Sequence, residues 1–256
     1  MILVSVPAWA HDPIFGLGPH VLFKGGVEIA PQYDVDRAGD ARLDKLSLQL
    51  TYGLTGDWAA GVDIPYVDRS NPTSSASGQG DISVFSKYRF WRKDSLGVQQ
   101  SVSAFGKIKT DSGENGIGTG TTDGILGLAY GYEGRKWYRW AALRHRFNGE
   151  NSNGFRRGDK TLIDLAGGVR LKQTGYLEPD TVWLLELNGE FGMRDELNGA
   201  ELVNTGGSEW FVSPGIFWTL RNFAVKAGVQ IPIASSLNEN QSKTDYRARL
   251  ILEWHL

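Results

Sequence analysis

The chain lacks cysteine, and none of its apolar runs approaches the roughly 18 residues that a transmembrane helix requires. The missing cysteine excludes disulfide bonds, zinc–thiolate sites and cysteine nucleophiles. The missing apolar run excludes a helical membrane protein. Neither sign of charge is in marked excess, because the 256 residues carry a formal net charge of −2. We therefore expect no nucleic-acid partner.

Glycine and aromatic residues are abundant, whereas proline is not. The chain contains 33 glycines, 9 tryptophans, 9 tyrosines and 11 phenylalanines, but only 9 prolines. Because glycine is unfavourable in helices, this composition favours a sheet protein over a helical one.

Polar and apolar residues alternate along residues 246–256. One face of this segment carries Tyr246, Ala248, Leu250, Leu252, Trp254 and Leu256. Such alternation is typical of a strand, and a strand at the chain end needs partners on both sides, which a closed barrel provides. The segment resembles the C-terminal assembly signal of bacterial outer-membrane barrels, although Leu256 stands where phenylalanine is usual. The barrel-assembly machinery is therefore an expected partner.

The same alternation recurs in about twelve segments of the length that a tilted transmembrane strand needs. The segments are 20–36, 43–54, 58–67, 82–91, 98–109, 123–133, 136–147, 160–171, 181–191, 209–219, 223–233 and 245–256. Short connections alternate with longer polar ones, as in outer-membrane barrels with short periplasmic turns and long external loops. The sequence thus predicts an all-β fold, an antiparallel up-and-down transmembrane β-barrel of about 12 strands. We expect it among the outer-membrane lipids of a Gram-negative bacterium, with both termini periplasmic.

Most tryptophans lie close to a predicted short turn or to the C-terminus, at one rim of the predicted barrel. They are Trp58, Trp91, Trp137, Trp140, Trp183, Trp218 and Trp254, while Trp210 lies at the other rim. An aromatic girdle at the membrane interface explains this clustering.

The first ten residues are apolar and end in Ala8-Trp9-Ala10, which fits a small-x-small cleavage site. We interpret residues 1–10 as a residual signal peptide. Residues 11–19 form an N-terminal periplasmic or plug segment in this interpretation, and residues 20–256 form the barrel.

If the apolar residues face lipid, the alternate residues line the lumen and carry charges of both signs. The predicted lumen-lining site residues are Asp63, Lys87, Arg89, Lys107, Glu186, Glu190, Lys226, Arg247 and Arg249. Such charges either brace the wall as structural ion pairs or surround a wet pore and steer a solute. The sequence leaves both interpretations open.

Three groups of short motifs follow one another along the chain. The first is Gly78-Gln79-Gly80-Asp81 with Lys87-Tyr88-Arg89-Phe90, the second covers 104–110 and 118–123, and the third covers 213–215, 227–232 and 245–247. Together they resemble the outer-membrane transporter family named for the meta-pathway of phenol degradation, although Lys109-Thr110 stands where a proline is usual. The resemblance covers most of residues 20–256. It implies a monomeric barrel that passes small aromatic or hydrophobic molecules, and it supplies no catalytic residues.

The sequence predicts a non-enzymatic channel that passes a small solute by passive diffusion through a narrow charged lumen. One alternative is a protein that binds or transports a metal ion such as copper. His11 would begin the mature chain, and its terminal amine and imidazole, with the imidazole of His20, can chelate copper. A second alternative is a lipid hydrolase in which His145 activates a serine. Phe147 occupies the usual place of that serine, and Ser152 lies in the following loop.

Overall fold

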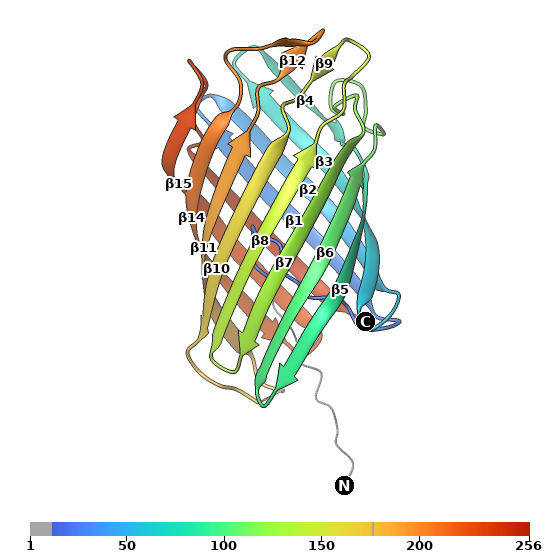
Figure 1. The fold of residues 1–256 in the computed structure, drawn as a ribbon, viewed down its shortest axis with the longest axis vertical. Coiled ribbons are helices and arrows are strands. Elements are labelled where there is room, and N and C mark those ends of the chain that lie inside the picture. The colour runs from blue at the N-terminus through green and yellow to red at the C-terminus, as the bar shows by residue number, and fades with distance from the viewer. Residues whose placement is uncertain (1–11, 176) are drawn as a thin grey trace.

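The computed structural model describes residues 12–175 and 177–256, and these form one closed antiparallel β-barrel (Figure 1). Thirteen strands belong to the barrel sheet. Because β4 and β5 pair with successive parts of β3, they count as one interrupted strand and the wall has twelve. The predicted barrel and its strand number are confirmed. No helix in these two ranges is long and apolar enough to span a membrane.

The wall strands follow the chain order around the barrel. They are β1 (Val27–Ala38), β2 (Ala41–Gly53), β3 (Trp58–Asn71), β4 (Ser74–Gln79), β5 (Ser83–Ser95), β6 (Val98–Lys109), β7 (Asp123–Gly134), β8 (Trp137–Phe147), β10 (Lys160–Arg170), β11 (Asp180–Gly192), β14 (Gly207–Leu220), β15 (Phe223–Leu237) and β16 (Tyr246–His255). The short strands β9 (Phe155–Arg156), β12 (Glu196–Leu197) and β13 (Ala200–Glu201) form a separate small sheet in the loops. We call the end that carries this sheet the loop end, and the opposite end the turn end (Figure 1).

The barrel closes where the first strand pairs with the last. Tyr33 of β1 lies opposite Leu250 of β16. The backbone of Val27 also exchanges hydrogen bonds of 3.0 and 2.8 Å with that of Leu256. Closure leaves no open sheet edge, which is the condition for a sheet to cross a lipid bilayer.

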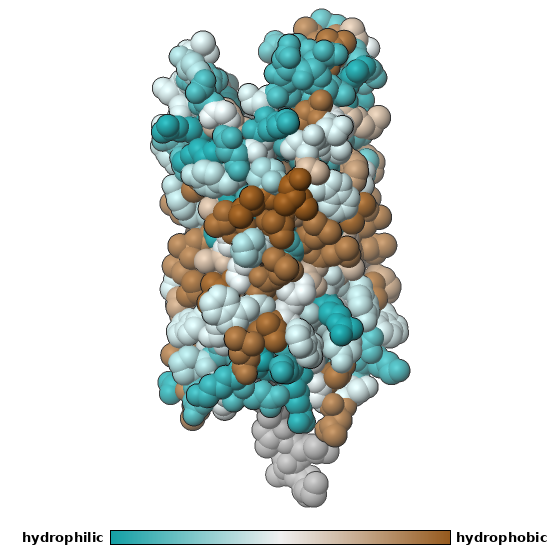
Figure 2. Space-filling view, turned by 90° about the vertical axis from the view of Figure 1, so that its left-hand side faces the viewer, coloured by the Kyte–Doolittle hydropathy of each residue, from teal (hydrophilic) through white to brown (hydrophobic). Residues whose placement is uncertain are grey.

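The two faces of the wall differ in polarity as the alternation predicts. Large apolar side chains point outward, with Leu126 60% and Leu185 57% exposed. Figure 2 shows hydrophobic residues gathered across the middle of the side in view, with mostly hydrophilic residues toward both ends. Small polar side chains such as Ser103, which is 1% exposed, point inward. The mean hydropathy of −0.29 is low because half of each strand faces the lumen and the loops are polar.

The predicted first strand is wrong at its beginning, since β1 starts at Val27 and not at residue 20. Residues 24–26 make a turn in which Gly25 has a φ of 78°, a conformation that glycine adopts without strain. Gly25 donates a 2.7 Å hydrogen bond to the carbonyl of Gly53 at the end of β2. Val21 and Leu22, which precede this turn, are buried. The assignment of residues 20–26 to the barrel wall is therefore corrected.

The predicted tryptophan rim is wrong for one member. Trp58, Trp91, Trp137 and Trp183 are exposed, as an interfacial girdle requires. Trp140 is instead 3% exposed and stacks on Tyr138, with ring centroids 5.6 Å apart. It lies three residues beyond Trp137 on the same strand, and side chains at odd spacings point to opposite faces.

Candidate functional site: the barrel lumen

Residues 12–22, which we call the N-terminal segment, lie inside the barrel. Asp12 pairs with Lys87 of β5 at 2.9 Å, and the carbonyl of Pro19 accepts a 2.6 Å hydrogen bond from Ser103 of β6. On the other side, Ile14 donates to Glu186 of β11. Because these strands belong to different parts of the wall, the segment crosses the lumen.

Glu186 is the main anchor of the N-terminal segment. Its carboxylate accepts hydrogen bonds from three successive backbone amides, those of Ile14 at 2.6 Å, Phe15 at 3.2 Å and Gly16 at 2.9 Å. The side chain is 1% exposed. The carboxylate satisfies three donors that would otherwise be buried without partners, so the contact holds the segment in one position.

Next to this anchor, an apolar cluster seals one side of the N-terminal segment. Ile14 packs in it with residues of β8, β11, β14 and β15, namely Tyr138, Trp140, Val182, Leu184, Phe217 and Ala224. These wall residues face the lumen although they are apolar. The charged lumen predicted from the alternation is therefore corrected on this side.

On the opposite side of the N-terminal segment, many of the wall residues are charged and a cavity lies between them and the segment. A cavity of about 220 Å³, which we call the inner cavity, is lined by Asp12, His20, Lys87, Lys107, Arg249 and Glu253, among others. Lys107 pairs with Asp63 at 2.9 Å across this side of the lumen.

The other predicted lumen residues are all engaged by partners within the chain. Lys226 pairs with Glu253 at 2.7 Å. Arg249 reaches Asp34 at 2.6 Å and the carbonyl of Ile14 at 2.8 Å.

Two further predicted residues lie closer to the ends of the barrel. Arg247 bridges Glu190 at 2.7 Å and Asp36 at 3.0 Å toward the loop end. Arg89 lies at the turn end, where it binds Asp57 at 2.8 Å and the carbonyl of Gly56 at 2.7 Å. Arg89 thus braces a turn and does not line the inner cavity.

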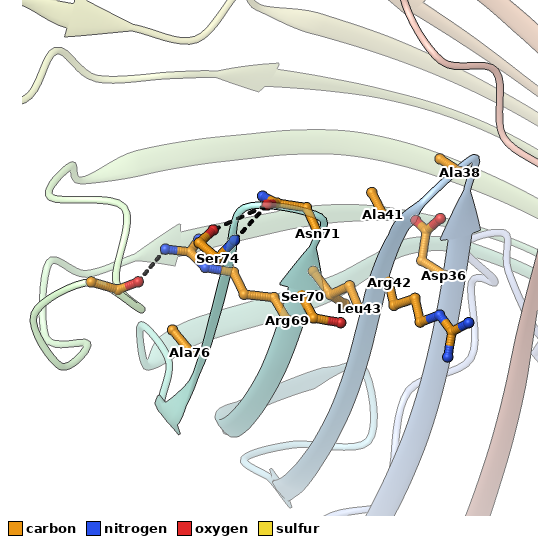
Figure 3. A pocket seen from close by; sticks show the side chains of 11 residues that line it. Asp36, Ala38, Ala41, Arg42, Leu43, Arg69, Ser70, Asn71, Ser74 and Ala76 are labelled. Carbon is orange, nitrogen blue, oxygen red and sulfur yellow. Dashed lines mark hydrogen bonds between the residues drawn. The ribbon is translucent and has the colours of Figure 1, made fainter.

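Two more cavities lie at the loop end. The larger, of about 410 Å³, lies between the β1–β2 hairpin and the β3–β4 hairpin (Figure 3). Arg69 crosses toward the neighbouring loop and donates to the carbonyl of Gly116. The smaller, of about 310 Å³, lies at the ends of β8, β10, β11 and β14 and is lined by Arg146, Arg157 and Lys160, among others. None of these arginines is among the lumen-lining residues predicted from the sequence.

A loop-end cluster forms around Lys109, the last residue of β6. Its ammonium group lies 3.0 Å from Asp81 and 3.1 Å from Asp123, and it also contacts Thr119 and the carbonyl of Thr121. Burial of Asp81 opposes its ionisation, but hydrogen bonds from Thr119, Lys109 and the amide of Gly113 outweigh it and lower the pKa of Asp81 below its ordinary value. The cluster ties the loop 110–122 to the start of β5 and the start of β7.

The histidines considered for metal binding fall in different places. His11 lies outside the described residues, and His20 lines the inner cavity. In the part of the chain that the structure describes, Glu28, Glu253 and His255 present ligand atoms within 4.8 Å of one another. Glu28 already contacts the Nε2 atom of His255 at 2.9 Å and Glu253 pairs with Lys226 at 2.7 Å, so partners within the chain occupy these groups.

The geometry gives no support to the lipid-hydrolase alternative. The Nδ1 atom of His145 lies 2.9 Å from the hydroxyl of Thr161, and its ring meets that of Phe147 edge-on at 4.5 Å. Ser152 is exposed in the loop after β8. The described contacts of His145 therefore include a threonine and no serine.

Comparison with known proteins assigns this barrel to a family. The model of the family described as the MetA-pathway of phenol degradation matches residues 8–236. The chain belongs to this family. The family motifs at 78–81, 104–110 and 118–123 contribute Asp81, Lys109 and Thr119, which meet in the loop-end cluster. Their proximity could not be read from alternation, because they lie on different strands and loops. The only signal in the sequence was that all three belong to the family motifs.

Solved structures similar to this family member are outer-membrane barrels. The COG4313 outer membrane channel from Pseudomonas putida F1 is similar with a TM-score of 0.70 and 16% identity, over 96% of this chain and 100% of that chain. The NanC porin has a TM-score of 0.52 and 11% identity, over 90% and 100% of the two chains. The β domain of the Bordetella autotransporter BrkA has a TM-score of 0.51 and 12% identity, over 90% and 99%. At such identities the likeness shows the fold alone. No curated protein matched the sequence.

Proposed function

We propose that this protein is a channel through which a small solute crosses the bacterial outer membrane by passive diffusion. The loops then face outward, and the turns and both termini lie in the periplasm, as in other outer-membrane barrels. We further propose that the barrel functions as a monomer, because its apolar outer band needs no partner other than lipid. The last strand would be recognised by the barrel-assembly machinery.

The observation that carries this proposal is the space around the N-terminal segment. The lumen holds the inner cavity of about 220 Å³ beside the segment and two larger cavities at the loop end. A purely structural barrel would fill its lumen with side chains. The N-terminal segment narrows the lumen and acts as a plug in this proposal, so the pathway runs along its charged side.

Small aromatic or hydrophobic molecules are the solutes we propose. The family description refers to phenol degradation. Phe15 of the N-terminal segment and the wall residues Phe85 and Phe105 are lumenal aromatic groups, and the last two also line the inner cavity. Aromatic side chains next to charged groups suit a solute with an apolar ring and a polar substituent.

Planar-bilayer conductance of the refolded protein tests the channel. We expect measurable conductance whose ion selectivity changes in Lys87→Gln, because Lys87 lines the inner cavity. Arg89→Gln is the matched control, because Arg89 is bound to the turn at Asp57 and Gly56. Absence of conductance, together with absence of solute flux into liposomes, would contradict the proposal.

Copper binding through His11 and His20 stays a prediction. His20 lines the inner cavity, so an ion bound there would lie on the proposed pathway. Calorimetry with copper should give heat that disappears in His20→Ala and persists in His145→Ala. Equal heats in both variants would reject the site.

A further inference from the structure

The 310 Å³ cavity at the loop end, which we call the arginine cavity, has the properties of a ligand site. Its volume lies at the lower end of the roughly 300–1,000 Å³ typical of small-molecule pockets. It is lined by Arg146 from β8, Arg157 from the following loop and Lys160 from β10. Three cations therefore meet at one side of the mouth. By the strand order, this side lies across the barrel from β2 and β3, which border the cavity of Figure 3.

Two of these cations have no acidic partner. Among residues 12–175 and 177–256, no carboxylate lies within ion-pair distance of Arg146 or Arg157. The Nε atom of Arg146 is buried and has no hydrogen-bond partner in those residues. A buried guanidinium N–H without an acceptor is costly, and it is retained where a ligand or solvent supplies the missing acceptor.

Three acids line the same cavity, and each is engaged by other groups. Asp195 accepts a 2.8 Å hydrogen bond from the amide of Gly158. Glu190 is shared between Lys160 at 2.9 Å and Arg247 at 2.7 Å. Glu209 accepts hydrogen bonds from Ser235 at 3.0 Å and from the hydroxyl of Thr244 at 2.9 Å. None of these acids forms an ion pair with Arg146 or Arg157 among the described residues.

A second unpaired atom faces the same space. Asn148 lines the cavity two residues after Arg146, and its amide nitrogen donates a 2.7 Å hydrogen bond to the carbonyl of Gly158. This bond orients the amide, and its Oδ1 atom is buried without a donor among the described residues. The cavity therefore offers unpaired cationic donors and one unpaired acceptor.

We propose that the arginine cavity binds a small organic carboxylate that carries a hydroxyl group. Arg146 and Arg157 hold the carboxylate, for which the guanidinium fork is the matching donor. The hydroxyl group donates to Oδ1 of Asn148. This inference rests on the proposed channel and names its solute class, since the cavity lies at the loop-end mouth of the lumen.

Calorimetry on the detergent-purified full chain tests the site with 4-hydroxybenzoate as the probe. We expect saturable binding that weakens about tenfold or more in Arg146→Gln, because a hydrogen bond between charged groups is lost. Arg139→Gln is the matched control, because Arg139 lies on the outer face of the same strand, next to Tyr132. This control should bind as the unchanged protein does.

Two further probes define the ligand class. The uncharged 4-hydroxybenzyl alcohol should bind at least about tenfold more weakly, because it offers no carboxylate. Inorganic phosphate that binds as tightly as 4-hydroxybenzoate would overturn the assignment, as would equal affinities in Arg146→Gln and Arg139→Gln. Thermal unfolding of both variants checks that they are folded.

Conductance measurements distinguish a failure of the carboxylate site from a failure of the proposed channel. Conductance without 4-hydroxybenzoate binding would overturn the carboxylate site and leave the channel standing. Binding without conductance or solute flux would support the site and contradict the channel.

Discussion

The two sides of the N-terminal segment are held in different ways. On the side of β8, β11 and β14, the apolar cluster packs against Ile14, and Glu186 binds three successive amides. On the side of β5, β6 and β16, the contacts are polar, and the inner cavity lies beside them. Lys87 pairs with Asp12, and Arg249 donates to the carbonyl of Ile14.

This difference suggests that one side holds the N-terminal segment in place and that the other side lets solutes pass. An apolar contact is stable only while water is excluded from it, so the sealed side cannot open without a large cost. Partly hydrated charges can exchange partners with a solute or with water at little cost. We therefore expect solutes to pass on the charged side while the segment remains attached on the other.

The largest effect is expected when the anchor carboxylate is removed. In Glu186→Ala, three buried amides lose their acceptor, which we expect to cost on the order of 3 kcal/mol or more. The N-terminal segment should then lose protection in hydrogen-exchange measurements, and conductance should rise. Glu178→Ala is the control, since Glu178 is exposed in the connection between β10 and β11. Unchanged protection of residues 12–22 in Glu186→Ala would show that the segment is held by other contacts.

A smaller effect is expected when the apolar cluster loses one side chain. Ile14→Ala leaves a cavity in a buried cluster and should destabilise the attachment by about 2–4 kcal/mol. The matched change Ile64→Ala removes the same atoms from the outer face and should not affect the segment. Hydrogen exchange of residues 12–22 measures the effect. Similar exchange in the two variants would mean that the cluster does not seal this side.

On the charged side, we expect changes in selectivity with little change in stability. Lys107→Gln and Asp63→Asn each break one partly exposed ion pair, which contributes less than about 1 kcal/mol. Lys107→Gln should shift the selectivity of the channel toward cations, and Asp63→Asn should shift it toward anions. Reversal potentials in a salt gradient measure both. Shifts of the same sign would show that ions do not pass this pair.

The smallest effect is expected at the loop-end cluster, and it depends on pH. Because the pKa of Asp81 is lowered from 3.8, its stabilising contribution is complete above 3.8 and is lost as pH falls through the lower folded value. Loop 110–122 should keep its protection from about pH 7 to about pH 4 and lose it below that range. Hydrogen exchange corrected for its intrinsic pH dependence measures this loss. Asp81→Asn should show weaker protection at neutral pH and no comparable acid transition, and an identical profile in both proteins would refute the role of Asp81.

The wall could be predicted because each strand must present apolar residues to lipid at every second position. The same rule failed at residues 20–26, since Val21 and Leu22 are buried inside the barrel and never meet lipid. It also left β8 ambiguous, because its two ends carry arginines on opposite faces. Arg139 lies over the ring of Tyr132 on the outer face, and Arg144 pairs with Asp164 in the lumen at 2.7 Å.

The partners of the lumen charges could not be predicted from the sequence. Arg247 pairs with Asp36, and Arg249 pairs with Asp34, across the seam between β16 and β1. These pairs join the first and last strands of the barrel. Alternation alone does not specify the register in which those two strands pair. Arg146 was missed for a related reason, since its lack of a partner becomes visible only when the neighbouring acids are seen to be engaged elsewhere.

The seam between β1 and β16 also bears on the order of folding. The N-terminal segment directly precedes β1, yet its contacts reach β5, β6, β11 and β16. A segment enclosed by the wall enters most easily while the ring is still open, so we expect it to be in place before the first and last strands pair. Contacts between residues so distant along the chain form slowly, and we therefore expect these two strands to pair late in biogenesis. On this view the constriction of the lumen is built during assembly and is not added to a finished pore.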